Sequence, residues 1–542
     1  MFGAGAMTNS IDEIRNADVL FVIGSNTTEA HPIIAMEMKR AIYRGATLIV
    51  GDPRQTWLAR HADIFLQMKP GTDVWLLNAM AHVIINEGLV NEEFIREHTE
   101  GFEAVRETVA DYTPEAAEAV TRVGADLIRK AARAYATTPK AGIYYTLGIT
   151  EHTHGTDNVY ALANLVLMTG HLGVTSAGLN PLRGQNNVQG ANDAGVSPLF
   201  FPGYQKVGDP AAQAHFEAAW GVPLSAEPGM NLNQMMKDLG DHGRIKGLFV
   251  MGEDIVLSEP NSTVLEQGLG SCEFVVVQDI FMTETARYAD VVLPAACFAE
   301  KEGVFTNSDR RVQRVRKAVD APGEAKADWE ILCELARAVG YAMPVYGHPR
   351  EIYAEMASLC DKFAGISHER IEETGRIQWP CSEPVSSGTR TLHQGGPLRG
   401  RAVFQAVQYR PSDELPDSEF PLLLSTGRTL YHYNVATQTR RESGPAAKQS
   451  ENFVEVNPQD AHELGLSDGA RVKVESRRGL VNAMVVVSSR MQEGCVWMPF
   501  HFAEEPTNRL TNDAGDNVTG TGEYKVCAVR ILSGQKEAEC QP

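Results

Sequence analysis

A single arginine stands among side-chain amides and glycines between residues 180 and 195. This stretch, NPLRGQNNVQGANDAG, contains Arg183 and lies between apolar helical sequence and proline-punctuated sequence. Clusters of Gly, Asn and Asp usually mark a surface loop. In a chain with a net charge of -20, however, an anionic substrate has to be attracted by local cations. Two hypotheses therefore remain for this stretch, a solvated loop and an anion-binding site.

Two carboxylates end apolar, strand-like runs. Asp52 and Asp279 stand at these ends, and the loops Gly24-Ser25-Asn26 and Gly252-Glu253 follow the preceding runs. At the carboxyl end of a parallel strand, such a carboxylate can accept hydrogen bonds from a ribose or from a guanine edge, and loop N–H groups can bind phosphate. Two half-sites of this kind predict two nucleotide-like ligands. The G-x-G-x-x-G pattern is missing from both, which disfavours NAD; loops that serve only packing are the alternative.

The elements around these carboxylates are duplicated. LFVIG (20 to 24) corresponds to LFVMG (248 to 252), and GDPRQTWLARHAD (51 to 63) corresponds to QDIFMTETARYAD (278 to 290). Six ungapped identities relate the second pair: Asp52, Thr56, Ala59, Arg60, Ala62 and Asp63 match Asp279, Thr283, Ala286, Arg287, Ala289 and Asp290. Apolar runs that alternate with helical periodicity predict parallel sheets covered by helices on both faces. An internal repeat of two α/β units follows.

Composition limits the classes of function. The 542 residues allow several domains, and the net charge of -20 with scattered lysines and arginines disfavours a nucleic-acid-binding face. No apolar run approaches the roughly 18 residues expected of a membrane-spanning helix. The eight cysteines are dispersed without a C-x-x-C or another zinc or iron-sulfur spacing, which is typical of reduced thiols in an intracellular protein. We therefore expect a cytoplasmic protein without a membrane span.

The last part of the chain changes character near Gly400. Short strand-like runs such as RVKVESRRGLVNAMVVVSS are bounded by Gly and Asp turns, which predicts an all-β barrel domain. We expect three domains: a first Rossmann-like domain over 1–185, a second with insertions over 186–390, and a barrel over 391–542.

With these motifs in hand, the chain resembles the molybdenum or tungsten bis-(pterin guanine dinucleotide) oxidoreductases, and within them the catalytic subunit of formate dehydrogenase. The matching stretches are GAMTNSIDEI (5 to 14), LLNAMAHVII (76 to 85), NPLRGQNNVQGANDAG (180 to 195), FPGYQ (201 to 205), VMGED (250 to 254), VQDIFMTETARYADVVLP (277 to 294), EGVFTNSDRRVQR (302 to 314) and EYKVCAVR (523 to 530). RGQNNVQG together with QDIFMTETA is typical of the formate branch.

The resemblance implies an α/β fold with two Rossmann-like αβα cofactor-binding domains and a C-terminal β-barrel of the double-psi type. In this family each α/β half holds the nucleotide end of one pterin cofactor, with the metal, Mo or W, between them. The implied cofactor contacts are Asn26, Asp52, Arg54 and Asp73 for one dinucleotide, Gly252, Glu253, Gln278 and Asp279 for the other, Gln185 for a pterin, and Arg428, His432, Tyr524 and Lys525 from the barrel. For Arg428, a solvated turn is the alternative.

The resemblance also implies a reaction, the oxidation of formate to carbon dioxide or its reverse. The cofactor carries out the electron chemistry, and the protein supplies binding and orientation. Arg183 then becomes the candidate catalytic residue, because a planar, permanently charged guanidinium grips a small carboxylate better than a lysine does. Electrons are expected to pass to a partner subunit of the iron-sulfur, flavin or hydrogenase type.

Formate dehydrogenases of this kind also carry an N-terminal segment with a 4Fe-4S cluster, a conducting lysine, and a Cys or selenocysteine followed by His that ligates the metal. Nothing of this segment occurs at MFGAGAMTNS or after it. We expect a truncated version of a longer chain, in which an in-frame selenocysteine codon was taken for a stop, with the metal ligand and the cluster upstream. No residue of the present chain is predicted to bind the metal.

Other functions and residues stay open. The rivals are another bis-pterin oxidoreductase, such as a nitrate reductase or a formylmethanofuran dehydrogenase, and a non-catalytic cofactor-binding or assembly subunit. His152 and His154 lie at i and i+2 without a third ligand, so ordinary polar contacts are favoured over a metal site, with pterin hydrogen bonding as an intermediate hypothesis.

Overall fold

The structure, a computed structural model, describes residues 1–240 and 243–533. The chain forms two compact units, each described here by itself. The first contains residues 1–182, 254–268 and those from 391 on, and the second contains residues 183–253 and 269–390. Among the described residues, no helix has both the length and the apolar character needed to cross a bilayer.

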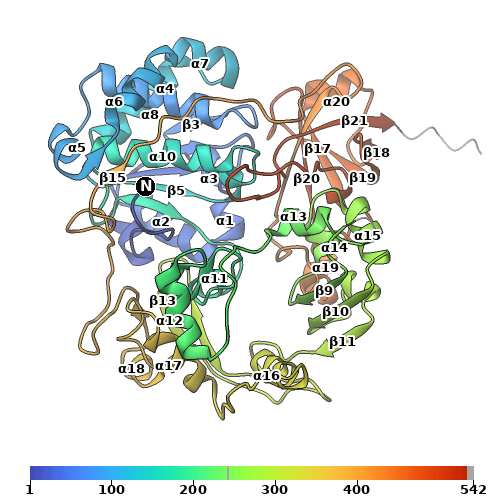
Figure 1. Cartoon of the computed structure of the whole chain (residues 1–542). Helices are drawn as coiled ribbons and strands as arrows, with labels where there is room; N and C mark the ends of the chain where they lie inside the picture. The colour runs from blue at the N-terminus through green and yellow to red at the C-terminus, as the bar shows by residue number, and fades with distance from the viewer. Residues whose placement is uncertain (241–242, 534–542) are drawn as a thin grey trace, which may run out of the picture. The chain divides into compact units, whose positions relative to one another are not determined.

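A five-stranded parallel sheet organises the first unit (Figure 1). Its order is β3-β2-β1-β5-β6, with β1 (Val19–Ile23), β2 (Thr47–Gly51), β3 (Ile64–Leu66), β5 (Ala141–Tyr145) and β6 (Gly178–Pro181). The helices of this part are α1 (Thr27–Ala30), α2 (Pro32–Tyr43), α3 (Trp57–Arg60), α4 (Asp73–Asn86), α5 (Glu92–His98), α6 (Phe102–Thr108), α7 (Pro114–Thr121), α8 (Ala125–Ala136), α9 (Leu147–Thr150) and α10 (Gly155–Thr169). The strand order reverses between β1 and β5, and ligands of open α/β sheets bind at such a switch point.

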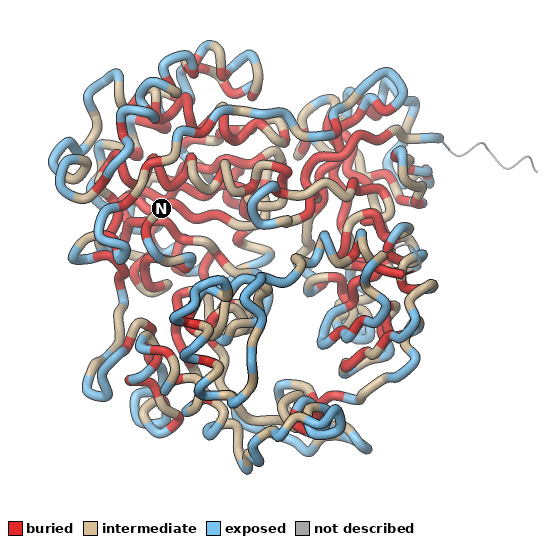
Figure 2. The backbone as a smooth tube through the Cα atoms, viewed as in Figure 1, coloured by how far each residue is buried: buried red, intermediate tan, exposed pale blue. Residues whose placement is uncertain are grey.

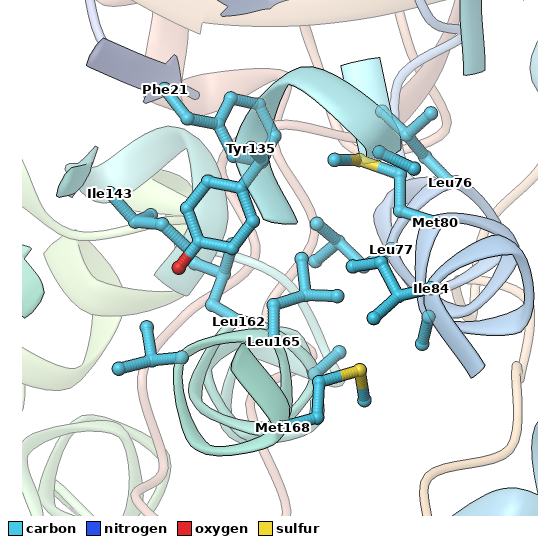
Figure 3. Close-up of a cluster of buried hydrophobic side chains, with 14 of the residues drawn as sticks. Phe21, Leu76, Leu77, Met80, Ile84, Tyr135, Ile143, Leu162, Leu165 and Met168 are labelled. Atoms are coloured by element: carbon cyan, nitrogen blue, oxygen red, sulfur yellow. The ribbon is translucent and has the colours of Figure 1, made fainter. Parts of the chain in front are cut away.

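Helices cover both faces of this sheet, which is why its strands are continuously apolar. Along β1, Phe21 belongs to a core shared with α4, α8 and α10, and this core is drawn in Figure 3. The next residue, Val22, packs on the opposite face with residues of α2, such as Met38. All five residues of β1 are buried, and Figure 2 shows the strands of this sheet in red.

The first unit also contains the predicted barrel. Six strands close it in the order β16-β20-β17-β19-β18-β21, with both parallel and antiparallel pairs. The strands are β16 (Leu422–Gly427), β17 (Phe453–Val456), β18 (Arg471–Glu475), β19 (Leu480–Val487), β20 (Cys495–Pro499) and β21 (Cys527–Ser533). The helices α14 (Ile255–Ser258), α15 (Ser262–Gly270), α19 (Ser443–Lys448) and α20 (Pro458–Glu463) and a short parallel pair, β4 (Thr99–Glu100) with β15 (Ala402–Val403), complete the elements. The predicted α/β fold with a C-terminal barrel is confirmed.

The second unit contains a smaller parallel sheet in the order β11-β10-β9. Its strands are β9 (Gly247–Met251), β10 (Phe274–Asp279) and β11 (Val291–Pro294). Two antiparallel sheets accompany it, formed by β12 (Gly303–Thr306), β13 (Arg311–Val315) and β14 (Ile377–Gln378), and by β7 (Phe200–Phe201) and β8 (Gln205–Lys206). The helices are α11 (Val188–Asp193), α12 (Pro210–Trp220), α13 (Leu232–Lys237), α16 (Asp328–Ala338), α17 (Pro349–Ser358) and α18 (His368–Thr374).

The internal repeat is present at the level of single hydrogen bonds. The bonds of the first copy are Leu48 N to Asp63 Oδ2 (2.8 Å), Arg54 N to Asp52 Oδ1 (2.9 Å) and Ala59 N to Thr56 Oγ1 (3.3 Å). Those of the second are Val275 N to Asp290 Oδ2 (2.7 Å), Phe281 N to Asp279 Oδ1 (3.0 Å) and Ala286 N to Thr283 Oγ1 (3.0 Å). The polar identities of the repeat therefore hold the turns that follow β2 and β10.

Candidate functional site

A cavity opens at the carboxyl ends of the first sheet, within the first unit. The loops after β1, β2, β3 and β5 line it together with the barrel residues that follow β16. Six residues predicted as cofactor contacts meet there: Asn26, Asp52, Arg54, Asp73, Arg428 and Lys525. Their convergence follows from the strand order, because the loops after β1 and β5 lie at the switch point of the sheet.

Two glycines allow these loops to touch. Gly24 has φ +56° and its carbonyl oxygen accepts hydrogen bonds from Gly148 N (3.2 Å) and Thr146 Oγ1 (2.6 Å). A Cβ atom on Gly148 would lie 2.5 Å from the Gly24 oxygen, a backbone atom that cannot move aside. The width of the cavity at the switch point therefore depends on Gly148.

Replacing Gly148 with Ala is expected to lower the free energy of unfolding by about 1–3 kcal/mol, as overpacking typically does. It should also weaken cofactor retention, measured as bound nucleotide released after denaturation. The matched control is Gly124→Ala, at a position where a Cβ meets nothing within 4 Å. Equal stability of the two variants would contradict the role assigned to Gly148.

Burial governs the ionisation of the cavity carboxylates. Desolvation raises the pKa of Asp52 to about 6, against the lowering effects of the Arg54 backbone hydrogen bond and of nearby cations. Desolvation also raises the pKa of Asp73 to about 7, and the Asp52 charge adds to this shift. Asp73 begins α4, so it also lies at the positive end of a helix dipole. Groups held at such a cost are typical of binding sites.

The shift of Asp73 predicts a dependence of stability on pH. Its folded-state pKa lies above its unfolded-state value, so the folded state binds the proton more tightly between about pH 4 and pH 7, and stability falls as pH rises through this range. Asp73→Asn mimics the protonated form and should raise the free energy of unfolding of cofactor-free protein, by about 1 kcal/mol more at pH 8 than at pH 5. Urea denaturation at both pH values measures this. The exposed Asp126→Asn is the control, and a difference independent of pH would refute the prediction.

Three buried polar atoms of the cavity lining have no hydrogen-bond partner within the protein. They are Asn26 Nδ2, Asp73 Oδ1 and His152 Nδ1. Burying a polar group without a partner is costly, so such atoms are usually satisfied by a ligand or by water. Burial lowers the pKa of His152 to about 4, so its imidazole is neutral. One donor, one acceptor and a neutral imidazole fit a polar, uncharged edge such as that of a base or a pterin.

Arg54 is tied to the barrel. Its Nε and Nη2 donate to the two carboxylate oxygens of Glu455 at 2.7 and 2.6 Å, and its guanidinium lies 3.8 Å from the ring centroid of Trp497. Arg54 and Trp497 both line the cavity. The sequence analysis missed Trp497, because nothing in the local sequence CVWMP distinguishes it from an ordinary core residue.

The other barrel residues differ in their placement. Lys525 pairs with Glu151 at 2.7 Å and Arg428 donates to Asn434 at 3.1 Å, and both line the cavity. His432 and Tyr524 are not among the lining residues. Both ring nitrogens of His432 have partners in the loop that they brace, Thr439 Oγ1 (3.2 Å) and Gln449 O (2.8 Å). A cofactor contact by His432 or Tyr524 stays a prediction.

The remaining predicted contacts lie in the second unit. Gly252, with φ +66°, and Glu253 follow β9, and Gln278 and Asp279 end β10. Gln278 is fully buried and donates through Nε2 to Asp328 Oδ1 (2.8 Å), whereas its Oε1 has no hydrogen-bond partner within the protein. The end of β10 thus repeats the pattern of an unsatisfied polar atom beside a strand-end carboxylate.

Arg183 and Gln185 also belong to the second unit. Gln185 is exposed, and Arg183 is half-buried. The Arg183 backbone N donates to Ser308 Oγ (3.1 Å) and its Nε donates to Gln189 Oε1 (3.2 Å). Hydrogen bonds from two directions make this stretch an ordered segment rather than a loose surface loop.

Known proteins confirm the relationship that these features suggest. Residues 2–338 match the family model described as Molybdopterin oxidoreductase. The chain belongs to the molybdopterin oxidoreductase family. Residues 422–528 match a second model, described as Molydopterin dinucleotide binding domain. The barrel residues of the cavity, including Arg428, Trp497 and Lys525, all fall in that range.

Relatives of this molybdopterin oxidoreductase include formate dehydrogenase subunits. It is 47% identical to the F420-dependent formate dehydrogenase 2 subunit alpha of Methanococcus maripaludis, over 98% of this chain and 78% of that protein. It is 41% identical to formate dehydrogenase H of Escherichia coli, over 99% of this chain and 76% of that protein. Acetylene Hydratase from Pelobacter acetylenicus shares the fold, with a TM-score of 0.77 and 20% identity over 98% of this chain and 80% of that one.

The residues of the cavity fit the dinucleotide cofactor that the family implies. The unpartnered atoms of Asn26, Asp73 and His152, the amino end of α4 and the strand-end carboxylate of Asp52 offer groups for a polar ligand with a phosphate. Among residues 1–240 and 243–533, no group of three or more His, Cys, Asp or Glu side chains is placed to hold a metal ion.

Proposed function

We propose that this oxidoreductase is the catalytic part of a formate dehydrogenase that uses a molybdenum or tungsten bis-(molybdopterin guanine dinucleotide) cofactor. The observation that supports the proposal most directly is its similarity to formate dehydrogenase alpha subunits along nearly the whole chain. One formate yields one carbon dioxide, two electrons and one proton. The bound cofactor supplies the two-electron acceptor, and the electrons then pass to a partner protein.

The chain's own residues bind and orient the reactants. In the first unit, Asn26, Asp52 and Asp73 would hold the nucleotide end of one cofactor, and Gln278 and Asp279 of the second unit would hold that of the other. Each of these residues stands at or just after a strand end, where backbone N–H groups and side chains converge.

Arg183 would anchor the substrate carboxylate. A guanidinium keeps its charge at all accessible pH values and offers paired donors that match a planar carboxylate. Gly184 gives its neighbourhood freedom for close approach, since a Cβ there would meet nothing within 4 Å.

The decisive experiment is the turnover of formate by the protein purified anaerobically from its native host. Formate-dependent reduction of benzyl viologen, with Mo or W in the sample by elemental analysis, supports the proposal. Nitrate consumption driven by reduced viologen, without formate oxidation, would instead favour the nitrate reductase alternative. Absence of both activities in metal-loaded protein would favour a non-catalytic subunit.

A further inference from the structure

A buried hydrogen-bond network lies beside Arg183 in the second unit. Gln189 is completely buried, and its Oε1 accepts the hydrogen bond from Arg183 Nε at 3.2 Å. Its Nε2 donates to Asp193 Oδ1 (2.9 Å) and to Tyr204 OH (2.8 Å). Gln189 and Asp193 lie four residues apart on α11, so they share one face of that helix. The three hydrogen bonds use both amide protons and the amide oxygen of Gln189.

The far side of the network is equally well satisfied. Tyr204 OH donates to Asp193 Oδ1 at 2.8 Å, and Trp379 Nε1 donates to Asp193 Oδ2 at 2.7 Å. Asp193 is 2% exposed, and its desolvation raises its pKa to about 6 although three donors favour the charged form. These donors permit one orientation of the Gln189 amide, with the oxygen towards Arg183 and the nitrogen towards Asp193.

The neutrality of Gln189 has an electrostatic consequence. A carboxylate in direct contact with Arg183 Nε would compete with an incoming anion, because opposite charges attract strongly at short range in a poorly solvated site. Here an amide makes that contact, and the carboxylate of Asp193 lies one side chain further away. The arrangement orients the arginine without placing a negative charge against its Nε.

We propose that Gln189 is a positioning residue that orients Arg183 towards the substrate anion through a contact that leaves the cation's charge intact. Asp193, Tyr204 and Trp379 fix the orientation of the Gln189 amide. This inference rests on the proposed function, in which Arg183 binds the carboxylate of formate.

The test uses the holoenzyme and the near-isosteric substitution Gln189→Glu. The new carboxylate would pair with Arg183, so we expect the KM for formate to rise at least ten-fold while kcat changes less than three-fold and the metal and nucleotide contents stay at the wild-type level. The matched control is Gln394→Glu, which adds the same charge at an exposed position of the other unit and should leave KM unchanged.

A second variant separates positioning from folding. Tyr204→Phe removes only the hydroxyl that holds the Gln189 amide, and we expect it to raise the KM for formate three- to ten-fold and to change the pH dependence of KM near pH 6, where Asp193 titrates. A KM within two-fold of wild type in either cofactor-loaded variant would overturn the inference and leave the proposed function standing. A wild-type holoenzyme without formate turnover would overturn both.

Discussion

Replacing Arg183 with Ala is expected to lower kcat/KM for formate by about a thousand-fold while the cofactor content stays unchanged. Truncating one partner of a hydrogen-bonded charge pair commonly costs 2–5 kcal/mol, and about 4 kcal/mol corresponds to this factor. Cofactor content should persist, because the residues proposed to hold the dinucleotides lie at the ends of β1, β2, β9 and β10, outside the segment of Arg183. Steady-state dye reduction with formate, together with elemental analysis, measures both quantities.

Arg183→Lys is the matched variant, because it keeps the charge and loses the planar pair of donors. Its kcat/KM should fall between those of the wild type and the alanine variant, since lysine binds a carboxylate as a point charge. If the alanine variant turned over formate at a near-normal rate, the stretch from 180 to 195 would be a polar segment without a role in substrate binding.

Removing the carboxylate of Glu455 should destabilise the first unit strongly. Glu455→Gln leaves the Arg54 guanidinium, whose side chain is 7% exposed, without its anionic partner, and breaking a buried pair costs about 3–5 kcal/mol. Because Arg54 lines the cavity, the variant should also retain less nucleotide. Urea denaturation and nucleotide release measure the two effects.

An exposed ion pair provides the control. Arg133 and Glu87 are joined by the same type of contact at 2.7 Å, with side chains 53% and 34% exposed. Glu87→Gln should therefore cost less than about 1 kcal/mol. A similar small loss in Glu455→Gln would show that water compensates the buried arginine and that the pair does not join the barrel to the first sheet.

Several features of the fold follow from local sequence. The uninterrupted apolar run of β1 predicts a strand covered on both faces, and the structure places Phe21 and Val22 in cores on opposite faces of the sheet. The repeat was also visible in the sequence, and Asp63 and Asp290 now have the same physical reason, since each accepts a backbone N–H of the neighbouring strand. Their identity reflects sheet construction and does not by itself indicate a ligand.

The candidate site was predictable in part. Asn26 and Asp52 follow or end strands, and this position alone places them at the carboxyl edge of the sheet, where the cavity lies. The same reasoning applied to the run AGIYYTLG would have selected Gly148. His432, in contrast, was selected by resemblance, and its hydrogen bonds show it bracing a loop of the barrel.

What the sequence by itself determined is the set of elements and the edge of the sheet at which polar groups gather, because hydrophobic periodicity and strand ends are local properties of the chain. Tertiary structure alone decided which distant residues complete the site. Arg54 and Glu455 are 401 positions apart, and Trp497 acquires its place only when the barrel closes beside the first sheet. The orientation of Gln189 likewise depends on Trp379, 190 residues away, through the carboxylate that both contact. Such partnerships arise from packing between elements, which no local pattern of residues encodes.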